Sequence, residues 1–273
     1  MCALLGVTTG GFYASRVRGA SRRSVEDARL RAQIDSVYQK SRRLYGSPRV
    51  THQLRMEGVV AGRRRVARLM RQHGIQGRSA RSYRRSRVGQ RAFYRRFPNT
   101  ERKVILNAPN LVWVADVTYI RVAGRWRYLA AVMDKYSRRI LGWSVSHHRT
   151  SALTRRALAN ALRHRPAPAG VVFHSDRGIE YAAHDLGRSL ADNGFLQSMN
   201  RPHHMNDNAH MESFFHSLKS EGLPGLTFAT DADLRSELSR YITFYNRQRL
   251  HSSLGYRSPV SFESTYLTTP GVN

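Results

Sequence analysis

The chain has 273 residues, with 46 Lys and Arg against 18 Asp and Glu, a net charge of +28. So large a positive charge favours a polyanionic partner, and nucleic acid is the first candidate; on charge alone, a ribosomal or membrane-surface protein is the alternative. The single cysteine, Cys2, excludes an intrachain disulfide framework and a cysteine-rich zinc module. No apolar run is long enough to span a membrane and no signal peptide opens the chain, so we expect a cytoplasmic protein.

Residues 1–20 predict a truncated helical segment. An apolar stretch around Leu4 and Leu5 meets a turn at Gly6, followed by a second short element. This pattern fits half of a helix-turn-helix whose partner segment lies upstream or on another chain. A plain N-terminal helix end fits it equally well.

Residues 21–76 predict a small all-α domain with helices at 24–43, 47–56 and 62–73. Ser24 and Ser47 are the expected N-caps, and Pro48 takes the first helical position after Ser47. Two short helices joined by a glycine turn, the second rich in arginine, are typical of a helix-turn-helix that binds DNA. A solvated basic helix pair is the alternative. The side chains expected on DNA are Arg49, Arg63, Arg64, Arg65 and Arg68.

Residues 77–106 keep no hydrophobic period. Arginine alternates there with Ser, Tyr and Phe, and such a segment cannot bury enough apolar surface to fold alone. We expect a basic linker that crosses the DNA backbone, with a flexible tether as the alternative. The linker side chains expected on DNA are Arg84, Arg85, Arg95 and Arg96.

Residues 107–263 alternate between strand and helix patterns, and a tail follows at 264–273. The strand patterns lie at 111–122, 126–133, 140–146, 170–173 and 195–199. Helical patterns lie at 151–163 and 183–193. Three antiparallel strands followed by helix, strand, helix and strand are the element order of a ribonuclease-H-like α/β fold, a mixed five-stranded sheet flanked by helices. In that order the first and fourth strands are neighbours at the sheet centre.

Three acidic residues stand where a solvated loop acid is not expected. Asp116 lies inside an apolar strand, Asp176 ends another strand just before Gly178, and Glu212 lies on a helix with aromatic neighbours. A buried carboxylate is unfavourable unless it is paired or ligates a metal, so the three indicate a shared cation. Oxygen-only ligands suit Mg²⁺ or Mn²⁺, and two such ions can bind both oxygens of a phosphodiester during an in-line displacement. Taken singly, each acid fits an ordinary turn, strand-edge or surface role.

The helix that carries Glu212 places two further polar residues beside it. At 100° per residue, Asn208, Glu212 and Lys219 cluster on one flank of the helix, at the border of its apolar stripe. We expect the carboxylate to reach a metal and the lysine to reach a phosphate. Arg177, which follows the second acid, is a further candidate for a phosphate contact. The core residues expected on DNA are therefore Asn208, Lys219 and Arg177.

Other residues receive structural roles. Asp134 is expected to hold the turn after the second strand, and Asp207 to cap the helix of Glu212. The tryptophans are expected in the core: Trp113, Trp126 and Trp143. One group near the C-terminus fits either DNA contact or packing: Arg247, Arg249 and His251.

These residues resemble a known family. The three acids have 59 and 35 residues between them, and a lysine follows the last by seven. Residues 174–178 read His-Ser-Asp-Arg-Gly, 207–209 read Asp-Asn-Ala, and 45–50 read Tyr-Gly-Ser-Pro-Arg-Val; a longer motif occupies 245–259. With them the chain, from Leu4 to Glu263, resembles the OrfB-type catalytic protein of insertion-sequence transposases, whose DDE integrase core is shared with retroviral integrases.

The resemblance implies cleavage at transposon ends and joining of the freed 3′-OH to another DNA strand. Asp116, Asp176 and Glu212 would hold two Mg²⁺ or Mn²⁺ ions, and Lys219 would contact the terminal DNA. Implied partners are double-stranded DNA at the ends and the target, further copies of the chain on DNA, and a helix-turn-helix and zipper protein of an upstream frame, within bacterial cytoplasm at the nucleoid.

Two stretches depart from the family pattern, residues 179–180 (Ile-Glu) and 203–206 (His-His-Met-Asn). Both leave recognition of the end sequence open. Two functions from other classes also stay open at this point: a DNA-binding repressor whose core is inactive, and a metal-dependent nuclease that does not join strands. The presence of all three acids and Lys219 favours the transposase.

Overall fold

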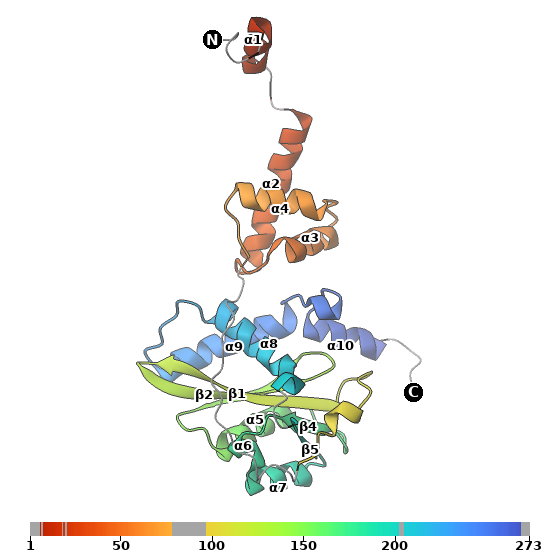
Figure 1. Ribbon diagram of the computed structural model, residues 1–273, viewed down its shortest axis with the longest axis vertical. Coiled ribbons are helices and arrows are strands. Elements are labelled where there is room, and N and C mark those ends of the chain that lie inside the picture. Colours follow the sequence, from red (N-terminus) through yellow and green to blue (C-terminus); the bar gives the residue numbers. More distant parts are fainter. Residues whose placement is uncertain are drawn as a thin grey trace. The chain divides into compact units, whose positions relative to one another are not determined.

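The computed structural model describes residues 6, 8–17, 19, 21–77, 97–201 and 205–268. The chain divides into two compact units, residues 1–78 and 79–273 (Figure 1). No helix within the described ranges is both long enough and apolar enough to cross a membrane.

The first unit is all-α, as its periodicity predicts. Its helices are α1 (Thr9–Val17), α2 (Arg22–Lys40), α3 (Ser47–Met56) and α4 (Arg63–Gln72). The last three helices share a small apolar core, because each carries an apolar stripe that is buried against the other two. The buried side chains of this core include Leu30, Ile34, Val37, Val50, Leu54, Val66 and Leu69.

Both predicted N-caps in this unit were wrong by a few residues. The cap of α2 is Ser21, whose hydroxyl accepts a hydrogen bond from the backbone N–H of Ser24 at 3.1 Å. The cap of α3 is Gly46, without a side-chain cap, and Ser47 already lies inside the helix with Pro48. A proline in the first turn fits either register, since the first N–H groups of a helix have no internal acceptor.

The second unit is built on the predicted mixed five-stranded sheet. Its strands are β1 (Val112–Val122), β2 (Arg125–Asp134), β3 (Ile140–Ser146), β4 (Val172–Ser175) and β5 (Leu196–Met199). Their order is β3-β2-β1-β4-β5, with β1 antiparallel to β2 and parallel to β4. The first and fourth strands are therefore neighbours at the centre, as expected. Strand β4 lies two residues later than predicted, because the polar His174 and Ser175 continue its ladder while Gly170 turns at φ 89°.

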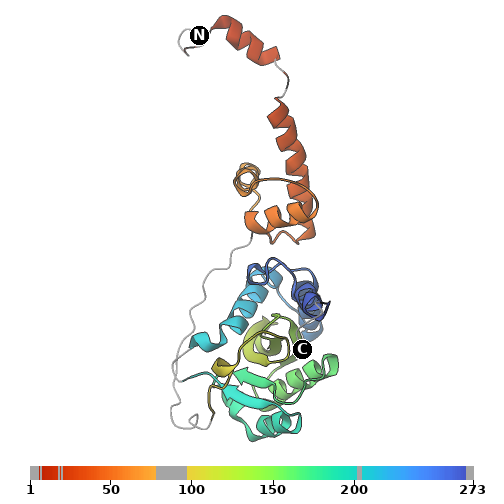
Figure 2. The same ribbon diagram turned by 90° about the vertical axis from the view of Figure 1, so that its right-hand side faces the viewer.

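Helices cover both faces of this sheet. On one face lie α5 (Ser151–His164), α6 (Ile179–Ala182) and α7 (His184–Asp192), and on the other α8 (Ala209–Ser217), α9 (Asp231–Arg247) and α10 (Pro259–Thr268) (Figure 1). The two helix layers are also separate in the turned view (Figure 2). Short helical segments lie between the longer elements of this unit or before them: η2 (Glu101–Lys103), η3 (Met205–Asn208), η4 (Leu218–Gly222) and η5 (Ser252–Leu254).

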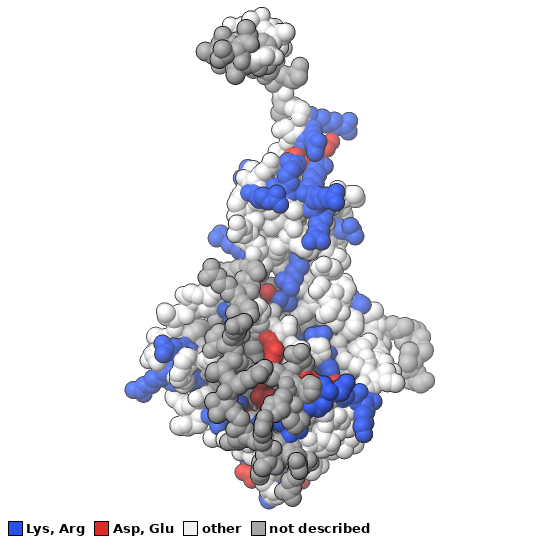
Figure 3. Space-filling model, viewed as in Figure 1, with Lys and Arg blue, Asp and Glu red and all other residues white. Residues whose placement is uncertain are grey.

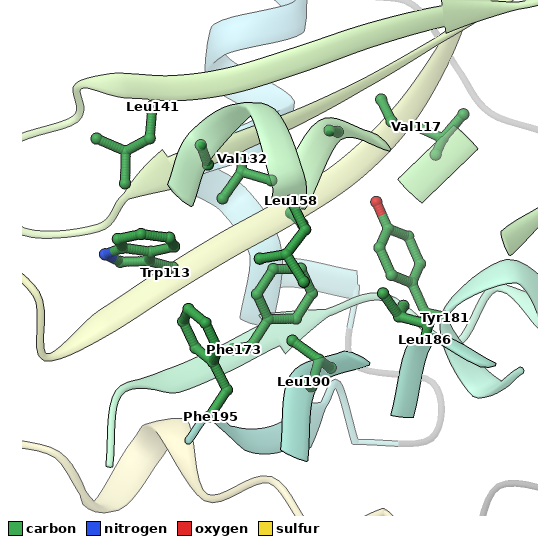
Figure 4. Close-up of a cluster of buried hydrophobic side chains, with 14 of the residues drawn as sticks. Trp113, Val117, Val132, Leu141, Leu158, Phe173, Tyr181, Leu186, Leu190 and Phe195 are labelled. Carbon is green, nitrogen blue, oxygen red and sulfur yellow. The ribbon is translucent and has the colours of Figure 1, made fainter. Parts of the chain in front are cut away.

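An apolar core fills the layer between the sheet and α5 and α7 (Figure 4). Trp113 is fully buried in it beside Phe195, with ring centroids 5.2 Å apart. Gly142 of β3 lets α5 approach closely, since a Cβ there would lie 2.3 Å from the backbone nitrogen of Ala161. The core prediction for Trp126 was wrong: it is 46% exposed, because β2 begins directly after the hairpin turn at residues 123–124 and Trp126 is its second residue. Trp143 is half-buried.

Candidate active site

Strand pairing brings the first two acids together. Ala115 of β1 pairs with Ser175, the last residue of β4, so Asp116 on β1 and Asp176 just after β4 each follow the last pair of the parallel ladder. Neighbouring strands lie about 4.8 Å apart, so these two residues are close neighbours where the ladder ends. Asp116 is 2% exposed, whereas the side chain of Asp176 is 28% exposed. One carboxylate is thus held in the sheet, and the other lies at the site's opening to solvent.

Short-range hydrogen bonds orient both carboxylates. Asp116 Oδ1 accepts from the backbone N–H of Val117 at 2.7 Å, and Asp176 Oδ1 accepts from that of Gly178 at 3.0 Å. The buried Tyr181 lies within the field of both acids. Burial raises the pKa of its phenol well above the usual range, and the charges of Asp116 and Asp176 raise it further.

An ion pair lies beside Asp176. Arg149 donates from Nε to Glu180 Oε1 at 2.7 Å, and its Nη2 lies 4.0 Å from Asp176 Oδ2. The Glu180 side chain is fully buried while that of Arg149 is 44% exposed. Burial raises the pKa of Glu180, although the hydrogen bond from Arg149 opposes this effect. Glu180 Oε2 is buried without a hydrogen-bond partner.

Asn208 connects the helix of the third acid to β1. Its Nδ2 donates to the backbone oxygen of Ala115 at 3.0 Å, next to Asp116, and its Oδ1 is buried without a partner. Glu212 lies one turn later on α8, and it is exposed. Within the described ranges, no three His, Cys, Asp or Glu side chains lie close enough to share a metal ion. The structure thus brings Asp116 and Asp176 together without Glu212, and the convergence of all three acids stays a prediction.

The donor set of the pair suits a hard divalent cation. The carboxylates of Asp116 and Asp176 offer only oxygen, the ligand that Mg²⁺ and Mn²⁺ prefer. The unpartnered Oδ1 of Asn208 adds a further buried oxygen, on a side chain that is hydrogen-bonded to this stretch of β1. Two carboxylates at this spacing repel each other, and a shared cation would relieve that repulsion. The residues present therefore fit the ions that the sequence predicted.

The capping role predicted for Asp207 was wrong. Asn208 is the N-cap residue of α8, without a side-chain cap bond, and Asp207 instead accepts from Asn99 Nδ2 at 2.8 Å and from Arg201 Nη2 at 3.0 Å. Burial alone would raise the pKa of Asp207, but the hydrogen bonds and charge of Arg201 outweigh it and lower this pKa to about 2. Asp134 does hold its turn, accepting from the backbone N–H of Ser137 at 3.0 Å.

Two of the predicted core contacts with DNA already have partners within the chain. Lys219 lies in η4, a π-helical turn, with Nζ 4.5 Å from the ring centroid of Tyr119 on β1. Arg177 donates to the backbone oxygens of Asn200 and Phe97. Their contact with DNA stays a prediction.

Of the C-terminal cluster, Arg249 is a packing residue. Its side chain is 6% exposed and donates to both carboxylate oxygens of Glu221, at 2.6 and 2.7 Å, and to Ser217 Oγ at 3.0 Å. His251 is also buried. Arg247 is exposed. Burial and a bidentate partner explain why Arg249 has no free donor face for DNA.

The arginines of the first unit fall into two groups. Arg65 and Arg68 both bind Asp27 of α2, each at 2.6 Å, whereas Arg63 and Arg64 are exposed. Basic side chains gather over the helices of this unit (Figure 3). Arg49 lies over the ring of Tyr45 at 5.6 Å. The predicted contacts in the linker lie outside the described residues: Arg84, Arg85, Arg95 and Arg96.

Arg149 is the site residue that the sequence did not predict. It stands in an irregular stretch between β3 and α5, where no periodicity marks it. Glu180 was noted as a departure from the family pattern, without a partner. The pairing of the two depends on loop geometry that brings residue 149 next to residue 180, and composition carries no signal for it.

Family models match both units of the chain. Models described as "Integrase core domain" match residues 107–205 and 193–259, and a model described as "HTH-like domain" matches residues 25–83. The integrase models span the sheet, both aspartates and α8, and the helical model spans α3 and α4.

Curated relatives align over nearly the whole chain. The "uncharacterized 31 kDa protein" of insertion element IS600 from Shigella sonnei is 36% identical over 268 residues, 97% of this chain and 98% of that protein. Transposase InsF of insertion sequence IS3A from Escherichia coli strain K12 is 35% identical over 277 residues, 98% of this chain and 94% of that protein.

A solved structure agrees with the fold. A chain of the simian T-cell lymphotropic virus intasome, solved by cryo-electron microscopy with the PP2A regulatory subunit B56 gamma, aligns with a TM-score of 0.52 at 13% identity. The alignment covers 88% of this chain and 77% of that one, and at this identity it supports the fold alone. With an HTH-like unit, an integrase core and full-length relatives above 30% identity, the chain belongs to the IS3-type insertion-sequence transposases.

Proposed function

We propose that this transposase cleaves phosphodiester bonds at transposon ends and joins the freed 3′-OH to another DNA strand. The observation that supports the proposal is that Asp116 on β1 and Asp176 just after β4 both follow the last pair of one parallel ladder. Two carboxylates so close in a chain of net charge +28 indicate a site that binds cations, within a protein built to bind a polyanion. Hydrolysis without joining would use the same ion site, whereas DNA binding without cleavage would need the basic surface but not the ion site.

Asp116, Asp176 and Glu212 would hold two Mg²⁺ or Mn²⁺ ions. When bound, such ions supply Lewis-acid stabilisation of the attacking and leaving oxygens of an in-line displacement. The buried Asp116 provides a fixed ligand because the sheet and the N–H of Val117 hold it. Asn208 ties the start of α8 to β1, so Glu212 is carried on a helix that begins beside Asp116.

Basic side chains would hold the DNA. Lys219 and Arg177 lie on the segments that follow Glu212 and Asp176, where they would contact phosphates near the cleaved bond. Arginines of the first unit and of the linker would contact the backbone of double-stranded DNA further from the site. Both transposon ends must be held together during joining, so we expect more than one copy of the chain on DNA, in the bacterial cytoplasm.

The test uses a duplex that carries the transposon end, incubated with the full-length protein and Mg²⁺ or Mn²⁺. Asp116→Asn, Asp176→Asn and Glu212→Gln should each reduce cleavage and joining by on the order of a hundredfold or more, since each removes charge from the ion site. DNA binding, measured by gel retention, should stay close to that of the unaltered chain. Asp185→Asn, at an exposed position of α7, is the matched control and should keep full activity.

The products decide between the open functions. Cleaved and joined strands support the transposase, cleaved strands alone support a nuclease, and retained but uncleaved DNA supports a repressor. Full activity in Glu212→Gln would remove Glu212 from the proposed site while leaving the aspartate pair in place.

A further inference from the structure

Two aromatic side chains of the β1–β2 hairpin lie in a row between two cationic side chains, one from the hairpin and one from η4. Arg121 lies over the ring of Trp126, with Cζ 4.7 Å from its centroid. Trp126 meets Tyr119 edge to face, with centroids 4.9 Å apart and planes at 84°. Lys219 lies over Tyr119 at 4.5 Å. We call Arg121, Trp126, Tyr119 and Lys219 the cation–aromatic row.

The row exposes an unusual amount of aromatic surface. Trp126 is 46% exposed, although indole rings are mostly buried in folded proteins. Arg121 and Trp126 are directly opposite in the antiparallel ladder, and so are Tyr119 and Tyr128, so Arg121, Trp126 and Tyr119 share one face of the hairpin. The exposed indole of Trp126 is therefore not isolated, because the ring of Tyr119 lies next to it on the same face.

The hairpin that carries the row is fixed in place. The backbone N–H of Ala123 in its turn donates to Phe228 at 2.8 Å. Arg127, whose side chain is 11% exposed, binds Asp231 at the start of α9 at 2.6 Å. A surface anchored at its turn and along its strand loses little conformational entropy when a ligand binds.

The row begins close to the proposed site. Strand β4 pairs with β1 only as far as Ala115, so β1 extends beyond β4 from Asp116 onward. Tyr119 is three residues beyond Asp116, about 10 Å along the strand and on the other face by alternation. Lys219 comes from the segment that follows α8, on the face of Asp116, and reaches Tyr119. The row thus crosses the edge of β1, about three stacked bases from the aspartate pair.

We propose that the cation–aromatic row binds unpaired DNA bases next to the strand being cleaved. Aromatic faces stack on any base, and arginine and lysine beside them neutralise the phosphates, which together form a platform for single-stranded nucleic acid. Cation–π contact alone would stabilise the hairpin, but it would not require the indole to stay exposed. The inference deepens the proposed function by assigning the unpaired terminal strand to this surface.

Tryptophan fluorescence tests the row without metal or catalysis. A base that stacks on an exposed indole quenches its emission, whereas Trp113 is fully buried and cannot be reached. Adding a short oligothymidylate to the full-length protein in EDTA should quench part of the emission. In Trp126→Phe the remaining emission should not change on addition, while Trp143→Phe, the matched control, should keep the quenching. Quenching that persists in Trp126→Phe, or binding without quenching in the unaltered chain, would overturn the proposal.

Affinity provides the second measurement. By fluorescence anisotropy of a labelled oligothymidylate, Trp126→Leu should bind roughly tenfold more weakly, the scale of one lost stacking contact, whereas Trp126→Phe should bind nearly normally. An abasic oligonucleotide of equal length should bind both variants alike. Equal affinity of Trp126→Leu and Trp126→Phe for the oligothymidylate would contradict the proposal that the row stacks on bases. If the unaltered chain shows quenching and the predicted affinities but no cleavage, the proposed function fails and the cation–aromatic row stands. If it cleaves DNA but shows neither quenching nor the affinity difference, the row fails and the proposed function stands.

Discussion

At the scale of single residues, the Arg149–Glu180 pair sets the charge next to the proposed ion site. A guanidinium 4.0 Å from Asp176 competes with any cation for that carboxylate. Glu180 limits this competition, because its fully buried side chain binds Nε and Nη2 of Arg149 and directs the positive charge away from Asp176.

Replacing Glu180 by glutamine should therefore weaken metal binding. In Glu180→Gln the guanidinium keeps its charge and loses its anionic partner, so Asp176 becomes its nearest counter-charge. The Mg²⁺ concentration for half-maximal cleavage should rise by roughly fivefold, the effect of about 1 kcal/mol at a partly solvated pair. The measurement is a Mg²⁺ titration of cleavage at saturating DNA.

The double variant Arg149→Ala with Glu180→Gln is the control for this effect, since it removes the cation together with its partner. Its Mg²⁺ midpoint should return to or fall below that of the unaltered chain. A midpoint that stays high in the double variant, or that does not move in Glu180→Gln, would show that Arg149 does not compete for Asp176. Denaturant unfolding of each variant separates this outcome from a loss of folding.

At the scale of elements, the π-helical turn η4 is held by a buried ion pair. Arg249 and Glu221 are each 6% exposed, and the Tyr241 hydroxyl donates to the same carboxylate at 3.1 Å. Gly222 follows directly, where a Cβ would meet the Tyr241 ring at 2.7 Å. π-Helical turns are frequent at functional sites, and this one carries Lys219. Arg249, within the motif at residues 245–259, thus packs against the segment that carries Lys219.

Removing one partner of this pair should be costly. Arg249→Met leaves Glu221 buried without a cation, so the free energy of unfolding should fall by about 3–5 kcal/mol. Arg247→Met, at an exposed position two residues earlier, is the matched control and should change it by less than about 0.5 kcal/mol. Chemical denaturation of both variants is the measurement. Equal effects of the two substitutions would contradict the packing role.

The sequence predicted elements better than it predicted their ends and their partners. Strands and helices of the core were found because alternation and 3.6-residue periods record which face is buried. The caps Ser21 and Gly46 were missed because another possible N-cap residue follows each within three positions. Only the backbone conformation shows which of them precedes the first helical residue. The exposure of Trp126 was missed because an apolar residue at the end of a hairpin looks the same as one in its middle.

The candidate site was predictable to the extent that topology fixes it. Asp116 and Asp176 could be placed together because parallel pairing of the first and fourth strands leaves little choice of register. The position of Glu212 could not, because its helix meets β1 through the side chain of Asn208 and no ladder fixes the distance. Ion pairs such as Arg149 with Glu180 depend on loop paths, which periodicity does not describe.

At the scale of the whole molecule, the 46 Lys and Arg residues overstate the number of cations available to DNA. Arg65 and Arg68 both form ion pairs with Asp27. Their hydrogen bonds lower the pKa of that carboxyl, and the bond from Arg68 has the larger effect. Arg127, Arg165 and Arg249 are likewise paired with acids inside the core unit. Internal ion pairs thus divide the arginines into those that hold the fold and those that face solvent.

This division predicts opposite consequences for two neighbouring arginines of α4. Arg64→Ala should leave thermal unfolding unchanged and reduce the slope of log binding constant against log salt by about 1, because one phosphate contact is lost. Arg65→Ala should lower the unfolding midpoint, because Asp27 loses a partner, and should change the salt slope much less. Salt titrations of duplex binding and thermal melts of both variants decide the matter. A larger loss of salt slope in Arg65→Ala than in Arg64→Ala would contradict this division. It would mean that DNA binding breaks the ion pair between Arg65 of α4 and Asp27 of α2, so that Arg65 contacts the DNA.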